Sequence, residues 1–187
     1  MTSADFRRVR FSAPDVVEVL EADPLEPGPG EVLVRSHVIG ICGSDLHALA
    51  GAHPFIDLPC DPGHEVAGEV VRVGAGVEGF APGQRVLVEP NLVCGTCHYC
   101  REGRYNICEN LLVFGCQTAG AMTDEFVIRV DRLHAVPDGM SDEAAALVEP
   151  MATATRAVRV AGGDLTGQRV AILGAGSIGL LTMWAAK

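Results

Sequence analysis

Four cysteines fall within fifteen residues of this chain, in the stretch CGTCHYCREGRYNIC. Two residues separate Cys94 from Cys97 and Cys97 from Cys100, and seven more intervene before Cys108. This spacing lets four sulfurs converge on one cation, and Zn²⁺ binds four thiolates at about 2.3 Å each in closed structural sites. The segment over residues 91–116 is therefore predicted to be a lobe built around a structural zinc ion.

An iron–sulfur cluster and disulfides are the alternatives for these sulfurs. A C-x2-C-x2-C run also opens bacterial ferredoxin motifs, but those continue with a close fourth cysteine followed by proline, whereas Glu109 follows Cys108 here. Disulfides persist in oxidising compartments, and the N-terminal stretch MTSADFRRVRF lacks the apolar region of a secretory signal. A cytoplasmic location is expected, which favours zinc.

The composition excludes several classes of function. The 24 acidic and 14 basic residues give a formal net charge of −10, which repels nucleic acid. No apolar run approaches the roughly 18 residues of a membrane span. With 187 residues, 48% of them hydrophobic, the chain is long enough for one buried core and the beginning of a second.

The first 150 residues are rich in short β-strand patterns broken by Gly/Pro turns, which predicts a compact, mainly β barrel as the first domain. The Pro/Gly-rich turn lies at 24–30. The expected strands cover 15–20, 31–39, 64–77, 84–89 and 122–130.

The pattern changes after residue 140. Ser141 followed by acids predicts a capped helix, and a second helix is expected from Pro150 to Ala161, where Gly162 and Gly163 end it. A buried strand is expected over 168–173. A domain boundary is predicted near residues 150–165, with 151–187 as the linking helix and the first β-α unit of a second domain.

The sequence GAGSIG follows the expected strand and opens an apolar helix. That context predicts the dinucleotide fingerprint of an α/β Rossmann domain, in which glycines let the backbone approach a pyrophosphate at a helix N-terminus. A tight turn without a ligand is the alternative. The expected ribose-binding acid, about 20 residues on, would lie past Lys187. The predicted NAD- or NADP-binding residues are Gly174, Gly176, Ser177, Ile178 and Gly179.

Further potential metal ligands lie at Cys42, at the pair His64 and Glu65, and at Glu149. Taken singly, each has an ordinary structural explanation: a small buried thiol, a barrel histidine, or an acid favoured at a helix start. Their order along the chain, however, matches a known family.

The chain resembles the zinc-dependent medium-chain alcohol dehydrogenases over essentially its whole length. Within that family, the acid Glu149 in the stretch LVEPMA makes the chain resemble the sorbitol and threonine dehydrogenase branch. The matching motifs are CGSDLH at 42–47, GHEVAGEVVRVGAGVEGFAPGQRV at 63–86, CGTCHYCREGRYNIC at 94–108 and ILGAGSIG at 172–179.

The resemblance implies a GroES-like catalytic domain with two zinc ions per chain, one of them in the four-cysteine lobe. Cys42 and His64 would bind the catalytic zinc, with Glu65 or Glu149 completing the shell; the family's second cysteine is replaced by Glu149. Asp45 would orient His64 from behind. The resemblance also implies that Ser44 and His47 relay a proton to solvent.

The implied reaction interconverts a small secondary alcohol and a ketone, with NAD or NADP as cofactor and a homo-oligomer as the expected assembly. A non-catalytic zinc-braced module and a zinc hydrolase are the alternatives. Because the fingerprint supplies only one strand and one helix, the 187-residue chain by itself is expected to bind zinc without turning over an alcohol. Cys60 and Cys116 are left without an assigned role.

Overall fold

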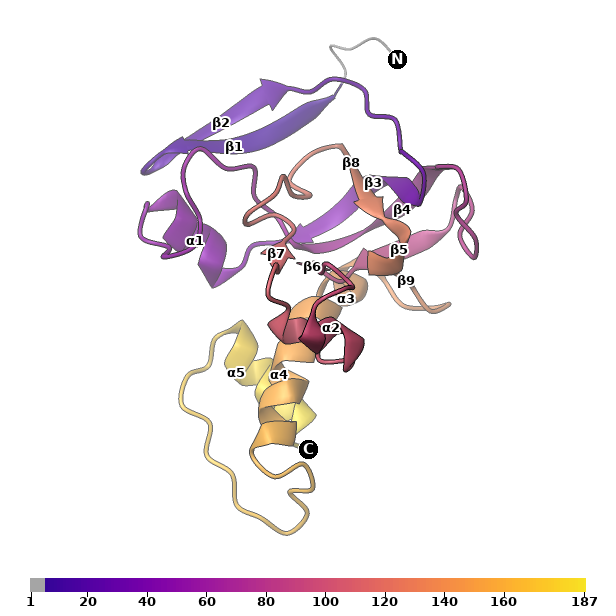
Figure 1. Cartoon of the computed structure of the whole chain (residues 1–187). Coiled ribbons are helices and arrows are strands. Elements are labelled where there is room, and N and C mark those ends of the chain that lie inside the picture. The colour runs from indigo at the N-terminus through magenta and orange to yellow at the C-terminus, as the bar shows by residue number, and fades with distance from the viewer. Residues whose placement is uncertain (1–5) are drawn as a thin grey trace. The chain divides into compact units, whose positions relative to one another are not determined.

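The computed structural model describes residues 6–187, which divide into two compact units, one up to Ala146 and one from Leu147 to Lys187 (Figure 1). The expectation about the N-terminal stretch falls partly on residues 1–5, outside the described part. Within that part, no helix is both long and apolar enough to cross a membrane. The predicted domain boundary at residue 150 stays a prediction.

The first unit is organised by a five-stranded antiparallel sheet (Figure 1). Its strands carry the core, in which the consecutive residues Val32, Leu33 and Val34 are all fully buried. Burying one such side chain contributes about 1.5–3 kcal/mol. In spatial order the strands are β8 (Glu125–Arg129), β3 (Glu31–Gly40), β4 (Glu65–Val73), β5 (Arg85–Val88) and β9 (Leu133–Ala135).

Two small sheets complete the β structure: β1 (Arg7–Ala13) pairs with β2 (Val16–Glu21), and β6 (Asn91–Leu92) pairs with β7 (Leu112–Val113). The mainly β first domain is as predicted, but the described strands do not close into a barrel. β8 and β9 are the edges of an open sheet, and isolated bridges from Arg8 to Thr123 and from Phe11 to Cys60 link β1 to loops. Alternation in the sequence gives the buried face of each strand, but closure depends on which strands pair.

One short helix of the first unit begins at its predicted cap. The Ala144 N–H donates to Ser141 Oγ at 3.2 Å, which confirms the predicted N-cap. Arg85 Nε donates to Asp142 Oδ1 at 2.8 Å and joins this helix to the sheet. The elements are α1 (Gly43–Leu49), α2 (His98–Arg101), η2 (Tyr105–Ile107), η3 (Val130–Arg132) and α3 (Asp142–Ala146).

The second unit contains α4 (Val148–Val160) and α5 (Ser177–Ala185), which pack against each other. The helix predicted from Pro150 begins two residues earlier, because a first-turn proline lacks only an N–H that the helix does not need. The strand predicted over 168–173 is not formed. A parallel strand needs neighbours for its backbone hydrogen bonds, the described residues of this unit contain no other strand, and Leu173 is 98% exposed.

Candidate metal centres

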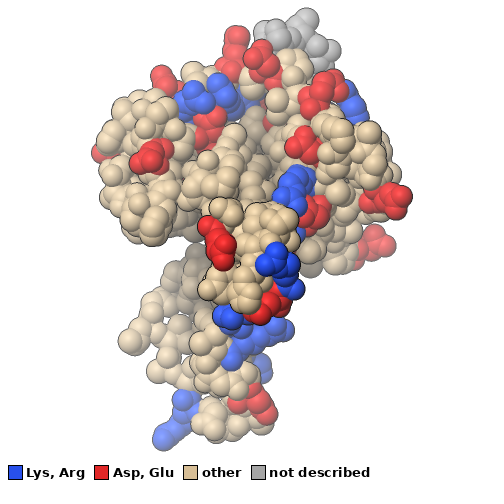
Figure 2. All heavy atoms as spheres, viewed as in Figure 1, with Lys and Arg blue, Asp and Glu red and all other residues tan. Residues whose placement is uncertain are grey.

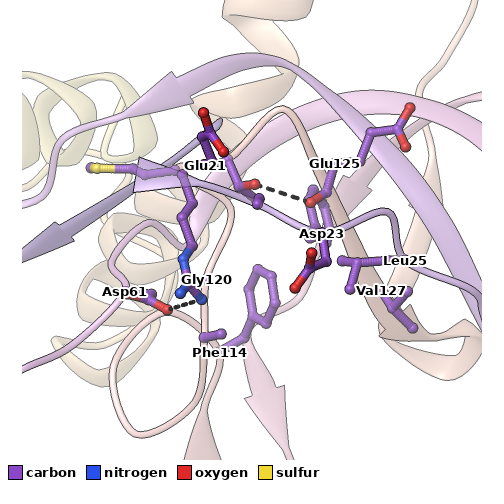
Figure 3. Close-up of a pocket in the computed structure, with 14 residues that line it drawn as sticks. Glu21, Asp23, Leu25, Asp61, Phe114, Gly120, Glu125 and Val127 are labelled. Atoms are coloured by element: carbon purple, nitrogen blue, oxygen red, sulfur yellow. Dashed lines mark hydrogen bonds and ion pairs between the residues drawn. The ribbon is translucent and has the colours of Figure 1, made fainter. Parts of the chain in front are cut away.

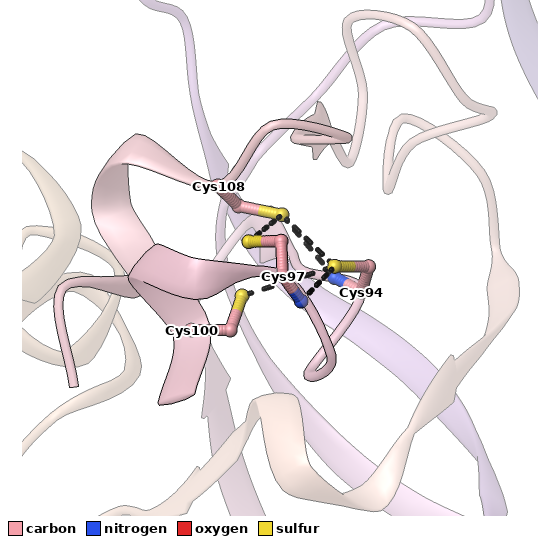
Figure 4. Close-up of side chains that lie close together, drawn as sticks. All are labelled: Cys94, Cys97, Cys100 and Cys108. Carbon is pink, nitrogen blue, oxygen red and sulfur yellow. Dashed lines mark hydrogen bonds between the residues drawn. The ribbon is translucent and has the colours of Figure 1, made fainter. Parts of the chain in front are cut away.

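The four lobe cysteines turn their sulfurs toward one another (Figure 4), and these sulfurs all lie within 4.8 Å of one another. The sulfur of Cys94 lies 4.0 Å from that of Cys100 and 3.5 Å from that of Cys108. The sulfurs of Cys97 and Cys108 are 3.9 Å apart. A tetrahedral ion with four bonds of about 2.3 Å requires sulfur separations of about 3.8 Å, whereas a disulfide bond is about 2.05 Å long. The geometry fits zinc and excludes disulfides among these four.

Backbone amides prepare these sulfurs to act as thiolates. The N–H groups of Thr96 and Cys97 point at Cys94 and lower the pKa of its thiol to about 5. Burial and the neighbouring thiols raise the pKa of Cys100 to about 12. Four adjacent thiolates repel one another, and a divalent cation removes this conflict. The donor set therefore fits a tightly held structural zinc ion.

The lobe is fixed to the edge of the sheet by arginines. Arg129 donates to the Val93 carbonyl at 3.0 Å, and Arg132 donates to the Asn91 carbonyl at 3.0 Å. Val93 is buried against the cysteines, which form a small core of their own. In so small a core, most of the ordering must come from the metal ion.

The second predicted set also converges. One ligand atom each from Cys42, His64 and Glu65 lie within 4.8 Å of one another. Cys42 caps α1 directly after β3, and Glu65 opens β4, so the pairing of β3 with β4 brings them together. Gly40 pairs with Glu65 across the sheet, and any side chain on Gly40 would overlap the Glu65 carboxylate. The site therefore depends on a glycine that the sequence reasoning did not single out.

Asp45 connects α1 to His64. Its Oδ2 accepts the Cys42 N–H at 2.8 Å and so caps the helix. Its Oδ1 lies 3.7 Å from His64 Nδ1, and both atoms are buried without a hydrogen-bond partner among the described residues. Burial raises the pKa of Asp45. The carboxylate thus lies behind the imidazole, where a group orienting a metal-bound histidine belongs.

The surroundings of His64 are strongly anionic. Burial opposes its protonation, but the thiols of Cys116 and Cys42 and the Asp45 carboxylate raise the pKa of His64 to about 11. A pocket that favours a positive imidazolium equally favours a metal cation in its place. Cys116 is the residue that the sequence reasoning missed. No local sequence pattern marks Cys116 as a neighbour of His64.

The other predicted site residues lie as follows. Ser44 is half buried in the first turn of α1, and the pKa of the nearby Cys42 thiol is lowered chiefly by His64 and also by Ser44. His47 is exposed in the same helix. Glu149 lies in the first turn of α4, in the second unit. The relay role of Ser44 and His47 and the ligand role of Glu149 stay predictions.

The glycine fingerprint forms a tight turn even without a paired strand. Gly174 has φ +109°, and a side chain on Gly179 would overlap the Gly174 carbonyl. α5 begins at Ser177 with Gly176 as its N-cap, and no atom lies within 4 Å of a side chain built on Gly176. Helix N–H groups are thus open at the position where a pyrophosphate would bind.

A separate hollow of about 310 Å³ lies away from both cysteine sets (Figure 3). Its lining includes four acidic residues: Glu21, Asp23, Asp61 and Glu125. Arg8 Nη1 donates to Asp61 Oδ2 at 3.3 Å.

On the face shown in Figure 2, basic residues are interspersed with acidic ones rather than gathered in one patch. Neither feature adds a metal ligand.

Comparison with known proteins identifies the family. Residues 28–138 match the model of the alcohol dehydrogenase GroES-like domain. L-threonine 3-dehydrogenase of Pyrococcus horikoshii is 42% identical over 173 residues, which cover 91% of this chain and 49% of that protein.

Comparison with solved structures also finds dehydrogenases. Galactitol-1-phosphate dehydrogenase from Escherichia coli superposes with a TM-score of 0.90 at 32% identity, covering 96% of this chain and 52% of that one. A Sinorhizobium meliloti protein solved with NADP bound gives a TM-score of 0.89 at 36% identity, with coverage of 97% and 52%.

The chain belongs to the zinc-type medium-chain alcohol dehydrogenases, and residues 28–138 are its GroES-like domain. The predicted resemblance is confirmed, and relatives of this chain are named as threonine, galactonate and sorbitol dehydrogenases. The chain spans about half the length of the curated relatives it matches.

Proposed function

We propose that this chain provides the metal-binding part of an enzyme that interconverts a secondary alcohol and a ketone with NAD or NADP. The observation that carries the proposal is the convergence of Cys42, His64 and Glu65, separate from the four-cysteine lobe. Three protein ligands and one open position are typical of catalytic zinc, whereas four thiolates are typical of structural zinc. The two ligand sets share no residue, so two zinc ions per chain are expected.

The residues present fit a zinc ion. A thiolate, an imidazole and a carboxylate are all zinc donors, and the anionic surroundings of His64 supply the charge complement. When bound, zinc would polarise the substrate oxygen and lower its pKa, while the nicotinamide would accept the hydride. Glu65 would complete the shell; Glu149 remains the alternative carboxylate, or the two would exchange.

The chain's own residues then have distinct tasks. Asp45 holds the ring of His64 in one orientation from behind. Ser44, whose hydroxyl lies beside Cys42, would take the proton of the substrate hydroxyl and pass it to His47, which is exposed to solvent. A positioned relay of this kind contributes typically 10²–10⁴-fold to the rate.

The relatives support the substrate and cofactor classes. Their names point to polyols, amino alcohols and hydroxy acids, and a neighbour with NADP bound supports a nicotinamide cofactor at Gly174, Gly176, Ser177, Ile178 and Gly179. The fingerprint glycines fit a pyrophosphate because Gly176 leaves the helix N-terminus open.

Elemental analysis combined with a nicotinamide-coupled assay tests the proposal. The 187-residue chain should bind two zinc ions, and Cys42→Ser should bind one. The whole protein should reduce NAD or NADP with an alcohol, with turnover lowered about 10–100-fold in Glu65→Gln. The 187-residue chain itself should show no turnover, because its second unit offers no paired strand to carry a nicotinamide site.

Other results would redirect the assignment. Two bound zinc ions without cofactor reduction by any alcohol in the whole protein would favour the non-catalytic zinc-braced module. Ester or amide cleavage that is lost in Cys42→Ser would favour a zinc hydrolase. One zinc ion at saturation in the unmodified chain would remove one of the two metal sites.

A further inference from the structure

Cys60 and Cys116 are the two of the seven cysteines that neither metal set uses. Both are half buried and pack against the same small cluster of Phe11, Ala48 and Ile56. Both also line a hollow of about 380 Å³ on the surface of the first unit. Two thiols from distant parts of the sequence therefore line the same solvent-accessible hollow.

Glycines hold the two segments in backbone contact. A side chain on Gly115 would overlap the backbone of Gly63, and one on Gly120 would lie 2.6 Å from the Pro62 carbonyl. The Gly120 N–H donates to the Asp61 carbonyl at 2.9 Å. The segments 60–63 and 115–120 thus cross without room for side chains, which brings the residues flanking the crossing beside each other.

Cys60 is held on its other side by strand-like bonding to β1. Its N–H donates to the Phe11 carbonyl at 3.0 Å, and the Phe11 N–H donates to the Cys60 carbonyl at 2.9 Å. Burial, followed by the charges of Asp61 and Cys116, raises the pKa of Cys60. The backbone of Cys60 is therefore fixed, and its side chain borders the same hollow as that of Cys116.

We propose that Cys60 and Cys116 form a modification site, a dithiol that hydrogen peroxide converts into a disulfide. One sulfur attacks the peroxide, the O–O bond breaks, and a sulfenic acid and one water form. The second thiol attacks that sulfur, the S–O bond breaks, and a second water leaves. Two thiols lose two electrons and two protons, and one peroxide becomes two waters. The hollow admits a molecule as small as peroxide.

The site is linked to the candidate catalytic metal through Cys116. Cys116 follows Gly115, whose backbone packs against that of Gly63, the residue before His64, and bonding to Cys60 would turn the Cys116 sulfur toward the hollow. This consequence rests on the proposed function, whereas the disulfide itself does not. Oxidation is expected to speed zinc loss from the His64 site several-fold and to leave the four-cysteine lobe loaded.

Peptide mapping tests the disulfide. The zinc-loaded 187-residue chain is treated with hydrogen peroxide, alkylated under denaturing, non-reducing conditions, digested and weighed by mass spectrometry. We expect one cross-linked pair, containing Cys60 and Cys116, that dithiothreitol separates. Cys60→Ser and Cys116→Ser should each abolish it and leave the remaining cysteine as a sulfenic acid that dimedone labels.

The proposal is overturned if both cysteines stay alkylatable, if each is oxidised alone to sulfinic acid, or if the cross-link joins a lobe cysteine. Unmodified chain suffices for this measurement, so variants that fail to fold do not prevent it. The link to His64 is tested by measuring zinc release to a chelator before and after oxidation. If the oxidised unmodified protein and the oxidised Cys60→Ser protein release zinc at equal rates, the link is refuted. Because peptide mapping detects the disulfide by mass, its result does not depend on whether the whole protein has the proposed activity.

Discussion

The Asp45 carboxylate faces the His64 imidazole at 3.7 Å between Oδ1 and Nδ1, with both residues buried, at 1% and 6% exposure. The same carboxylate caps α1 through the Cys42 N–H. One buried acid thus ties two expected ligands to each other, because it holds the helix that carries Cys42 and lies behind the ring of His64.

Asp45→Asn should lower zinc affinity at this site about 10–100-fold, because an amide orients the ring less firmly than a carboxylate. Loss of the charged cap should also cost roughly 1 kcal/mol of unfolding free energy. Chelator competition and thermal unfolding measure the two effects. Asp138→Asn, at an exposed position of the same unit, is the control, and equal affinities in the two variants would contradict the role of Asp45.

Gly40→Ala should remove zinc from the Cys42 site and spare the lobe, because the added methyl group overlaps the Glu65 carboxylate. Elemental analysis should give one ion in place of two. Gly43→Ala is the matched control, since no atom lies within 4 Å of the added carbon there, and it should keep both ions. A Gly40→Ala protein with full zinc content would show that Glu65 is not a ligand.

Cys97→Ser should lose the lobe zinc and much of the folded protein, since structural zinc contributes about 10–16 kcal/mol in small zinc peptides. His98→Gln changes an exposed neighbour and should leave zinc content and melting temperature unchanged. Equal melting temperatures for the Cys97→Ser and unmodified proteins would refute the structural role of this zinc.

Asp142 gives a pH-dependent contribution to stability. Burial opposes its ionisation, but bonds from Arg85 and His37 outweigh burial and lower the pKa of Asp142. Its contribution is therefore complete above the unfolded-state pKa of about 3.9 and disappears as the pH falls through the lower folded-state value.

Asp142→Asn should accordingly destabilise the first unit by roughly 1 kcal/mol at pH 7, as expected for a partly exposed charge network. The difference from the unmodified protein should shrink below about pH 4. Urea unfolding across this pH range measures it, with Glu78→Gln at an exposed position as control. A difference independent of pH would assign the effect to packing.

The features that the sequence determined are local ones. The four lobe cysteines fall within fifteen residues, so their spacing alone brings the sulfurs within reach of one ion. The Ser141 cap and the turn from Gly174 into α5 are likewise set by neighbouring residues, whose backbone angles and side chains act over one or two turns.

Only the tertiary structure decided the long-range features. Cys42 and His64 were recognised through resemblance, but the pairing of β3 with β4 is what brings them together. Nothing in the sequence near Cys116 shows that its segment packs against the residue before His64. The sheet stays open, although its strands carry the pattern of a barrel. Residues 168–173 lack a strand partner, although their sequence is typical of a buried strand. A pattern gives each segment its preferred conformation and buried face, whereas pairing depends on backbone groups distant in the chain.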